Sequence, residues 1–147
     1  MKTIFKNAFM VLAVLALGFS ACTELEYAPA EVPSNDQVFF SSTISKQIEI
    51  EMDSKSFDFV VNRAVAGEST IVPVTVVADS LAHAWFEFPE AIEFADTMKT
   101  AVCTVAVKDG AVFEYDKFAK VSITIAPEHA TPYGDATYSF KVGVPAP

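Results

Sequence analysis

The stretch Ser56–Arg63, SFDFVVNR, decides the fold because its side chains alternate with a period of two residues. Phe57, Phe59 and Val61 fall on one face of an extended chain, and Asp58 falls on the other. Such alternation is typical of a β-strand with one face buried and the other in water. The stretch therefore predicts a strand whose phenylalanines contribute to an apolar core.

The same period recurs on both sides of this stretch. Upstream, Ile48, Ile50 and Met52 alternate with acidic residues, and downstream Val121, Ile123 and Ile125 alternate with polar ones; both runs predict strands. About eight or nine short strands follow one another at a spacing of about ten residues, and no convincing helical period is found among them. We predict an all-β fold over residues 37–144, an antiparallel β-sandwich of about eight strands with a core rich in the chain's 13 phenylalanines.

The residues before the sandwich have the pattern of an export signal. Lys2 and Lys6 precede an uncharged run over residues 8–19, and Ser20 and Ala21 are small residues before Cys22. The run is about 12 residues long, whereas a membrane span needs about 20, which disfavours a retained transmembrane anchor. Ordinary secretion with cleavage near Ala21 is one interpretation of this pattern.

Cys22 makes this signal similar to those of bacterial lipoproteins, in which small residues precede a cysteine that is acylated. The resemblance implies that residues 1–21 are a cleaved signal peptide and that Cys22 becomes the lipidated N-terminus. Residues 22–36 carry Pro29, Pro33 and several glutamates without a hydrophobic period, and they are predicted to be an extended tether. Residues 145–147 have the composition of a linker.

The charge of the chain excludes one class of partner. Removing Lys2 and Lys6 from the 10 basic residues leaves 8, against 19 acidic residues, so the formal charge after cleavage is −11. Nucleic-acid binding depends on Lys and Arg, and Arg63 is the only arginine in the chain, so no nucleic-acid partner is expected. Attachment to a membrane would depend on the acyl chains on Cys22 rather than on charge.

The second cysteine, Cys103, lies on an apolar alternating face with Ala101 and Val105. A thiol in such a place behaves as a small hydrophobic group, so we predict that Cys103 is a buried core residue. A reactive thiol needs a basic and partly exposed neighbourhood, which only Lys99 and Lys108 at the ends of the segment could supply.

Several segments in order resemble a known family, the Calx-beta and related immunoglobulin-like modules of Bacteroidetes surface lipoproteins. The resemblance covers residues 37–144 and rests on SFDFVVNR, STIVPVTVV, FEFPEAIEF, the strand over residues 100–108 and EYDKFAKVSITI. It implies an immunoglobulin-like sandwich on an outer-membrane lipoprotein that is exposed at the cell surface. Acidic residues shortly after Cys22 also resemble the surface-export signal of such lipoproteins.

The resemblance also implies a candidate calcium site. Calx-beta domains of the calcium-regulated type bind Ca²⁺ through acidic residues in the loop before the late strands, and the matching positions here are Asp109, Glu114 and Asp116. A calcium ion takes about six to eight oxygen ligands, and three carboxylates beside Lys117 are few. A solvated acidic loop is therefore favoured, and no cofactor is expected.

A second candidate site lies on the outer face of the strand predicted at residues 83–88. Alternation that buries Phe86 and Phe88 turns His83, Trp85 and Glu87 outward. An exposed tryptophan beside a carboxylate suits stacking on a sugar ring or contact with a protein partner. The favoured interpretation is nevertheless that Trp85 covers an edge of the sandwich or packs on a loop.

The residue patterns disfavour catalysis. The two histidines, His83 and His129, lack the spacing of a metal site, and the chain has no Gly-rich phosphate loop and no G-x-S-x-G turn. Glu87, Glu90 and Glu93 lie along one surface rather than across a cleft, as a glycosidase would need. We therefore expect a non-catalytic envelope module that acts as a spacer or interaction domain, with glycan or protein binding and calcium-stabilised adhesion as the alternatives.

Overall fold

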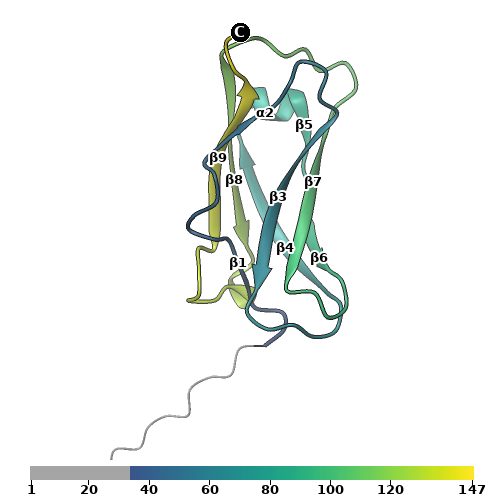
Figure 1. The fold of residues 1–147 in the computed structure, drawn as a ribbon, viewed down its shortest axis with the longest axis vertical. Coiled ribbons are helices and arrows are strands. Elements are labelled where there is room, and N and C mark those ends of the chain that lie inside the picture. The colour runs from purple at the N-terminus through teal and green to yellow at the C-terminus, as the bar shows by residue number, and fades with distance from the viewer. Residues whose placement is uncertain (1–33) are drawn as a thin grey trace, which may run out of the picture. The chain divides into compact units, whose positions relative to one another are not determined.

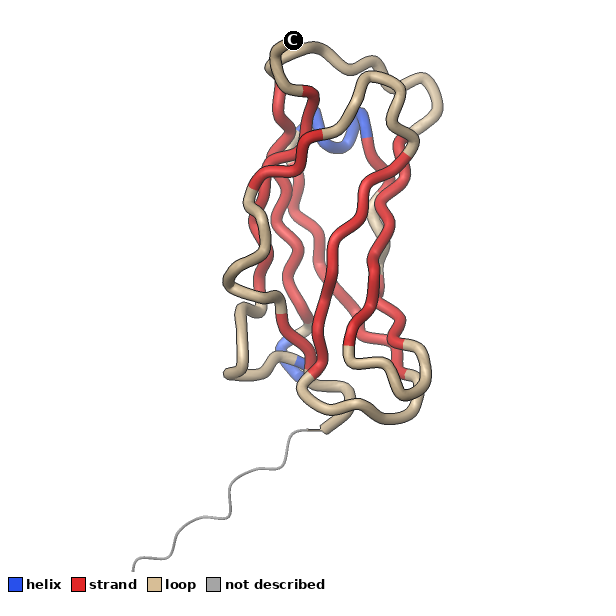
Figure 2. Tube along the Cα trace, viewed as in Figure 1, coloured by secondary structure: helices blue, strands red, loops and turns tan. Residues whose placement is uncertain are grey.

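A computed structural model describes residues 34–147; the predicted signal peptide, Cys22 and most of the tether lie outside the described residues. The described part is an all-β sandwich of two sheets, as predicted (Figures 1 and 2). Nine strands and two short helical segments make it up, in the order β1 (Val38–Phe39), β2 (Gln47–Glu49), β3 (Ser56–Arg63), β4 (Thr70–Ala78), α2 (Ser80–Trp85), β5 (Phe86–Glu87), β6 (Ala91–Phe94), β7 (Thr100–Val107), β8 (Lys117–Ile125), η2 (Pro127–His129) and β9 (Thr137–Val144).

The strand order of the two sheets has the immunoglobulin arrangement. One sheet has the order β1-β3-β7-β5, and the other has the order β2-β9-β8-β4-β6. When β2 and β6 are left out and the other seven strands are lettered A to G along the chain, the first sheet has the order A-B-E-D and the centre of the second has the order G-F-C, as in the two sheets of that fold. The predicted sandwich of about eight strands is therefore confirmed, with nine strands observed.

One pair of strands departs from the antiparallel prediction. Every other ladder is antiparallel, but β2 pairs with β9 in parallel, with Ile48 opposite Val142. Strand β1 pairs with β3 in the first sheet. The chain then crosses to the second sheet, where it forms β2 and runs in the same direction as β1. Since β9 also runs in that direction, a strand that changes sheets without turning back must meet it in parallel.

The core lies between the sheets and follows the alternation of β3. Phe57, Phe59 and Val61 are buried there, as predicted. The rings of Phe57 and Phe59 pack against Tyr138 and Phe140 of β9, and the latter two rings stack on each other with centroids 4.5 Å apart. Aromatic pairs of this kind add to the energy of burial, so β3 and β9 hold the two sheets together.

The strand predicted from Ile48 to Met52 is shorter in the structure. Ile50 is buried, but β2 ends at Glu49 and Met52 is 45% exposed. A turn explains the difference, because the Ser54 backbone N–H donates to the Glu51 carbonyl and the Ser54 hydroxyl accepts from the Glu51 N–H. The turn begins before Met52 can reach the inner face.

The described chain begins and ends at opposite ends of the sandwich. Val38 pairs with Arg63 at one end, called here the tether end, and η2 lies at the same end because Ala130 forms a bridge with Val38. Val144 pairs with Lys117 at the other end, called here the C-terminal end (Figure 1). β3 and β9 run in opposite directions between these two ends.

Arg63 organises the tether end. Its side chain is only 2% exposed, and its Nε donates to the Met98 carbonyl at 2.5 Å. The two Nη atoms donate to four further carbonyls, those of Asn35, Glu68, Gly67 and Ala95, at 3.4, 2.8, 2.9 and 3.2 Å respectively. The five N–H groups of a guanidinium match these five carbonyls, so the charge is fully hydrogen-bonded although it has no carboxylate partner within residues 34–147.

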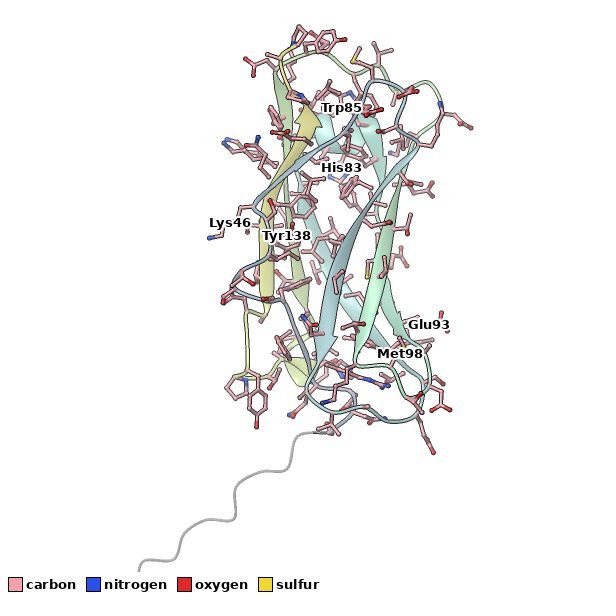
Figure 3. All side chains as sticks on the ribbon, viewed as in Figure 1. Lys46, His83, Trp85, Glu93, Met98 and Tyr138 are labelled. Carbon is pink, nitrogen blue, oxygen red and sulfur yellow. The ribbon has the colours of Figure 1, made fainter. Side chains whose placement is uncertain are left out.

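These bonds join three segments that lie far apart in the sequence: residues 34–37, 64–69 and 95–99 (Figure 3, near Met98). The guanidinium also lies over the Phe94 ring, 5.4 Å from its centroid. Gly67 permits the close approach, since a Cβ there would lie 2.7 Å from the Asn35 Cβ. Arg63, the last residue of the SFDFVVNR stretch, therefore connects the start of the sandwich to its loops through hydrogen bonds.

Replacing Arg63 by Met should lower the free energy of unfolding by about 2–4 kcal/mol, because buried carbonyls lose their donors while the side-chain volume is largely kept. Urea unfolding measures the change. Lys99→Met, at an exposed residue of the same end, is the control and should change stability by less than about 0.5 kcal/mol. Equal effects of the two substitutions would contradict the role of Arg63.

Candidate functional site

The outward orientation of Trp85 that alternation predicted is wrong, and the favoured interpretation, that Trp85 packs on a loop, is confirmed. Trp85 is 3% exposed and belongs to the helix α2, not to a strand. Its indole Nε1 donates to the Val112 carbonyl at 2.9 Å, and its ring packs edge-on against Phe113 with centroids 5.1 Å apart. Trp85 therefore closes the C-terminal end of the core between α2 and the loop after β7 (Figure 3).

The helix explains why the alternation of residues 83–88 misled. The Asp79 side chain caps α2 by accepting from the Ala82 backbone N–H at 2.8 Å. Residues three apart on a helix share a face, so Ala82 and Trp85 are both buried and His83 between them is exposed. Asp79 is a preferred N-cap residue, and it is the signal in the sequence that could have revealed the helix.

His83 and Glu87 are exposed as predicted, but Trp85 does not join them. The two residues line a shallow hollow of about 380 Å³ that also takes in Phe88 and Lys108. The Lys108 ammonium donates to the His83 backbone carbonyl at 2.7 Å. The predicted stacking surface therefore lacks the tryptophan ring, and the hollow is lined by both polar and apolar side chains.

The three calcium candidates are not gathered into one cluster. Glu114 pairs with Lys117 at 2.6 Å, and Asp116 adopts a left-handed backbone conformation at the start of β8, with φ of 58°. Asp109 lies in the turn after β7 with Gly110. Within residues 34–147, no group of three or more His, Cys, Asp or Glu side chains is arranged to hold a metal ion.

Cys103 is a core residue of β7, as predicted. It lies opposite Phe59 in the β3–β7 ladder and is 7% exposed. Burial and, to a smaller extent, the negative charge of Asp58 together raise the pKa of the thiol to about 11. The thiol is therefore protonated at neutral pH and poorly suited to nucleophilic chemistry.

A feature that sequence reasoning missed lies on the outer face of the second sheet. A hollow of about 620 Å³ lies over β4, β8 and β9, and its charged and hydroxyl-bearing lining residues are Lys46, Lys120, Lys141, Asp79, Ser122 and Ser139. We call it the lysine hollow. The alternation showed that Lys120 and Lys141 face outward, but the strand register that puts them opposite each other could not be read from the sequence.

The chain matches no family model and no curated protein. In the part of the chain that the structure describes, no helix has the length and hydropathy of a membrane span. The resemblance to Calx-beta modules and to surface lipoproteins therefore stays a prediction from the sequence.

Trp85 is the only tryptophan, so fluorescence reports its burial directly. The native protein should emit at short wavelength and be quenched weakly by acrylamide, and unfolding should shift the emission to longer wavelength. Trp85→Phe should lower the free energy of unfolding by about 1–3 kcal/mol, because the Val112 carbonyl loses its donor and a cavity is left. The control His83→Gln should be close to neutral; strong quenching of the native protein would contradict the burial of Trp85.

The thiol of Cys103 should make stability depend on alkaline pH. The unfolded thiol ionises near 9.0 and the folded thiol near 11, so between these values the unfolded state alone loses a proton and stability falls as pH rises. Urea unfolding from about pH 8 to about pH 11 should show a shallower fall for Cys103→Ala than for the natural protein. Tyr138, whose pKa is raised by burial to about 12, contributes equally to both proteins. Identical pH profiles would refute the assignment.

Proposed function

We propose that the protein is a non-catalytic, lipid-anchored spacer of the bacterial cell envelope that holds another module or a partner at its C-terminal end away from the membrane. The observation that carries this proposal is the position of the chain at the two ends of the sandwich. Residues 34–38 lie at the tether end, and residues 144–147 lie at the C-terminal end. A module that the chain crosses from end to end adds its full length to the distance between its neighbours.

The dimensions suit such a role. β3 has 8 residues, so it extends about 25 Å at about 3.3 Å per residue. The 14 residues from Thr23 to Asp36 could add at most about 45–50 Å if fully extended. If a lipid on Cys22 anchors the chain, the C-terminal end of the sandwich would lie tens of ångströms from the bilayer surface.

The start of the sandwich is held firmly, as a spacer requires. Besides the Arg63 bond to the Asn35 carbonyl, the Asn35 side chain donates to the Glu68 carbonyl at 3.4 Å. His129 Nδ1 lies 3.3 Å from an Asp36 carboxylate oxygen, and a hydrogen bond from the Ser34 hydroxyl, helped by His129, lowers the pKa of Asp36. A pulling force on the tether would therefore be transmitted directly to the sandwich.

The same proposal includes the cleavage of residues 1–21 as a signal peptide and the acylation of Cys22. It also includes attachment to the outer membrane and exposure at the cell surface. They rest on the sequence pattern around Cys22 and on the resemblance to Bacteroidetes lipoproteins. The acidic body supports dependence on the lipid, since anionic lipid headgroups repel it.

Energy transfer from the protein to the membrane tests the spacer. The acylated full chain carries a donor dye at Glu128→Cys, near the tether end, or at Ala146→Cys, near the C-terminal end, and acceptor dye lies in the vesicle surface. We expect less transfer from residue 146 than from residue 128, because the sandwich separates them by its length. Cys22→Ser is the control for anchoring and should leave the protein in solution. Equal transfer from both positions would contradict the proposal.

A further inference from the structure

The lysine hollow concentrates positive charge on an acidic chain. Lys46, Lys120 and Lys141 are three of the seven lysines in residues 34–147, and all three line this hollow. Lys120 lies directly opposite Lys141 in the β8–β9 ladder, and the Lys141 backbone N–H donates to the Lys46 carbonyl at 2.9 Å. Like charges directly opposite each other across a sheet destabilise it, so this arrangement is not explained by folding.

No carboxylate neutralises these lysines within the described residues. The ion pairs of residues 34–147 involve Lys117 and His129, not the lysines of the hollow. Asp79 is the one acidic residue in the lining, but its two carboxylate oxygens accept backbone N–H groups of Ala82 and Lys120 at 2.8 and 2.9 Å. Three exposed lysines therefore border the hollow, whose lining atoms are mainly apolar, and none of the three has an ion-pair partner among residues 34–147.

The floor of the hollow adds hydroxyl and apolar groups. Ser122 and Ser139 lie opposite each other, with their hydroxyl oxygens 2.7 Å apart, so each keeps hydrogen-bonding capacity toward solvent. Val77 lies opposite Ser122 on β4 and is 68% exposed. The lysine stems and Val77 form an apolar surface, while the ammonium groups and hydroxyls form the polar one.

We propose that the lysine hollow binds an acidic saccharide, with ammonium groups on its carboxylates or sulfates and Ser122 and Ser139 on its ring hydroxyls. A sugar ring has an apolar face of C–H groups that suits Val77 and the lysine stems. Ammonium groups act as point charges without the bidentate geometry of arginine, and they suit anionic groups spaced along a chain. The volume of about 620 Å³ falls in the range of small-ligand sites.

The position of the hollow favours a saccharide over an acidic peptide. An extended peptide is usually bound by adding a strand to an open sheet edge through backbone hydrogen bonds. The floor here is the face of β8 and β9, and β8 is a central strand paired with β4 on one side and β9 on the other. Its backbone groups are already used, so side chains alone must recognise the ligand.

Titration calorimetry of the protein at low salt tests the proposal with four probes: oligogalacturonate, a sulfated heparin oligosaccharide, a neutral dextran oligomer and a polyglutamate peptide. We expect binding of the carboxylated or the sulfated saccharide, which identifies the anionic group, and weaker binding as salt is added. The neutral dextran should not bind. Failure of both acidic saccharides to bind, or tighter binding of polyglutamate, would overturn the proposal.

Variants locate the binding to the hollow. Lys120→Gln and Lys141→Gln should each weaken saccharide binding about fivefold or more. Lys55→Gln removes the same charge from an exposed residue outside the hollow and should leave the affinity within about twofold. Neither hollow variant should lower the melting temperature, because each removes one partner of a like-charge pair. Equal affinities of Lys120→Gln and Lys55→Gln would place the binding elsewhere and refute this site.

Discussion

The hydrogen bonds of the buried Arg63 guanidinium are the interaction on which the tether end of this protein depends. A charged group out of water is costly unless every donor is used, and here five carbonyls from three separate segments meet the five N–H groups. Those carbonyls in turn need the guanidinium, because loops that bury their backbone must find partners for it. The start of the sandwich, the loop after β3 and the loop before β7 are thus fixed by a single side chain.

The positions of the two ends follow from this constraint together with the change of sheet between β1 and β2. Arg63 ends β3, which pairs with β1, so the described chain starts beside it. The chain then crosses to the second sheet as β2 and meets β9 in parallel. The last strand consequently finishes at the end remote from Arg63. A spacer role is consistent with that path, and the outer face of β8 and β9 stays open for the saccharide proposed at the lysine hollow.

Period-two alternation was sufficient to predict the sandwich, the buried face of β3 and the burial of Cys103, because these depend on which side of a strand each residue occupies. It failed at Trp85, where the segment is a helix capped by Asp79, so that the helical period and not the period of two decides burial. It also failed at the lysine hollow, because Lys120 and Lys141 are brought together by strand register, which a list of alternating residues does not contain. The clustering of Asp109, Glu114 and Asp116 was implied by resemblance alone, and local geometry gives Glu114 a lysine partner instead.

The most direct test of the central role of Arg63 is the nuclear magnetic resonance spectrum of its guanidinium. Arg63 is the only arginine, so its side-chain N–H signals in the ¹⁵N-labelled protein can be assigned without ambiguity. If the guanidinium is buried and bonded to five carbonyls, its Nη–H protons should give separate signals that exchange slowly with water at neutral pH. Rapidly exchanging, averaged Nη–H signals like those of an exposed arginine would contradict the account.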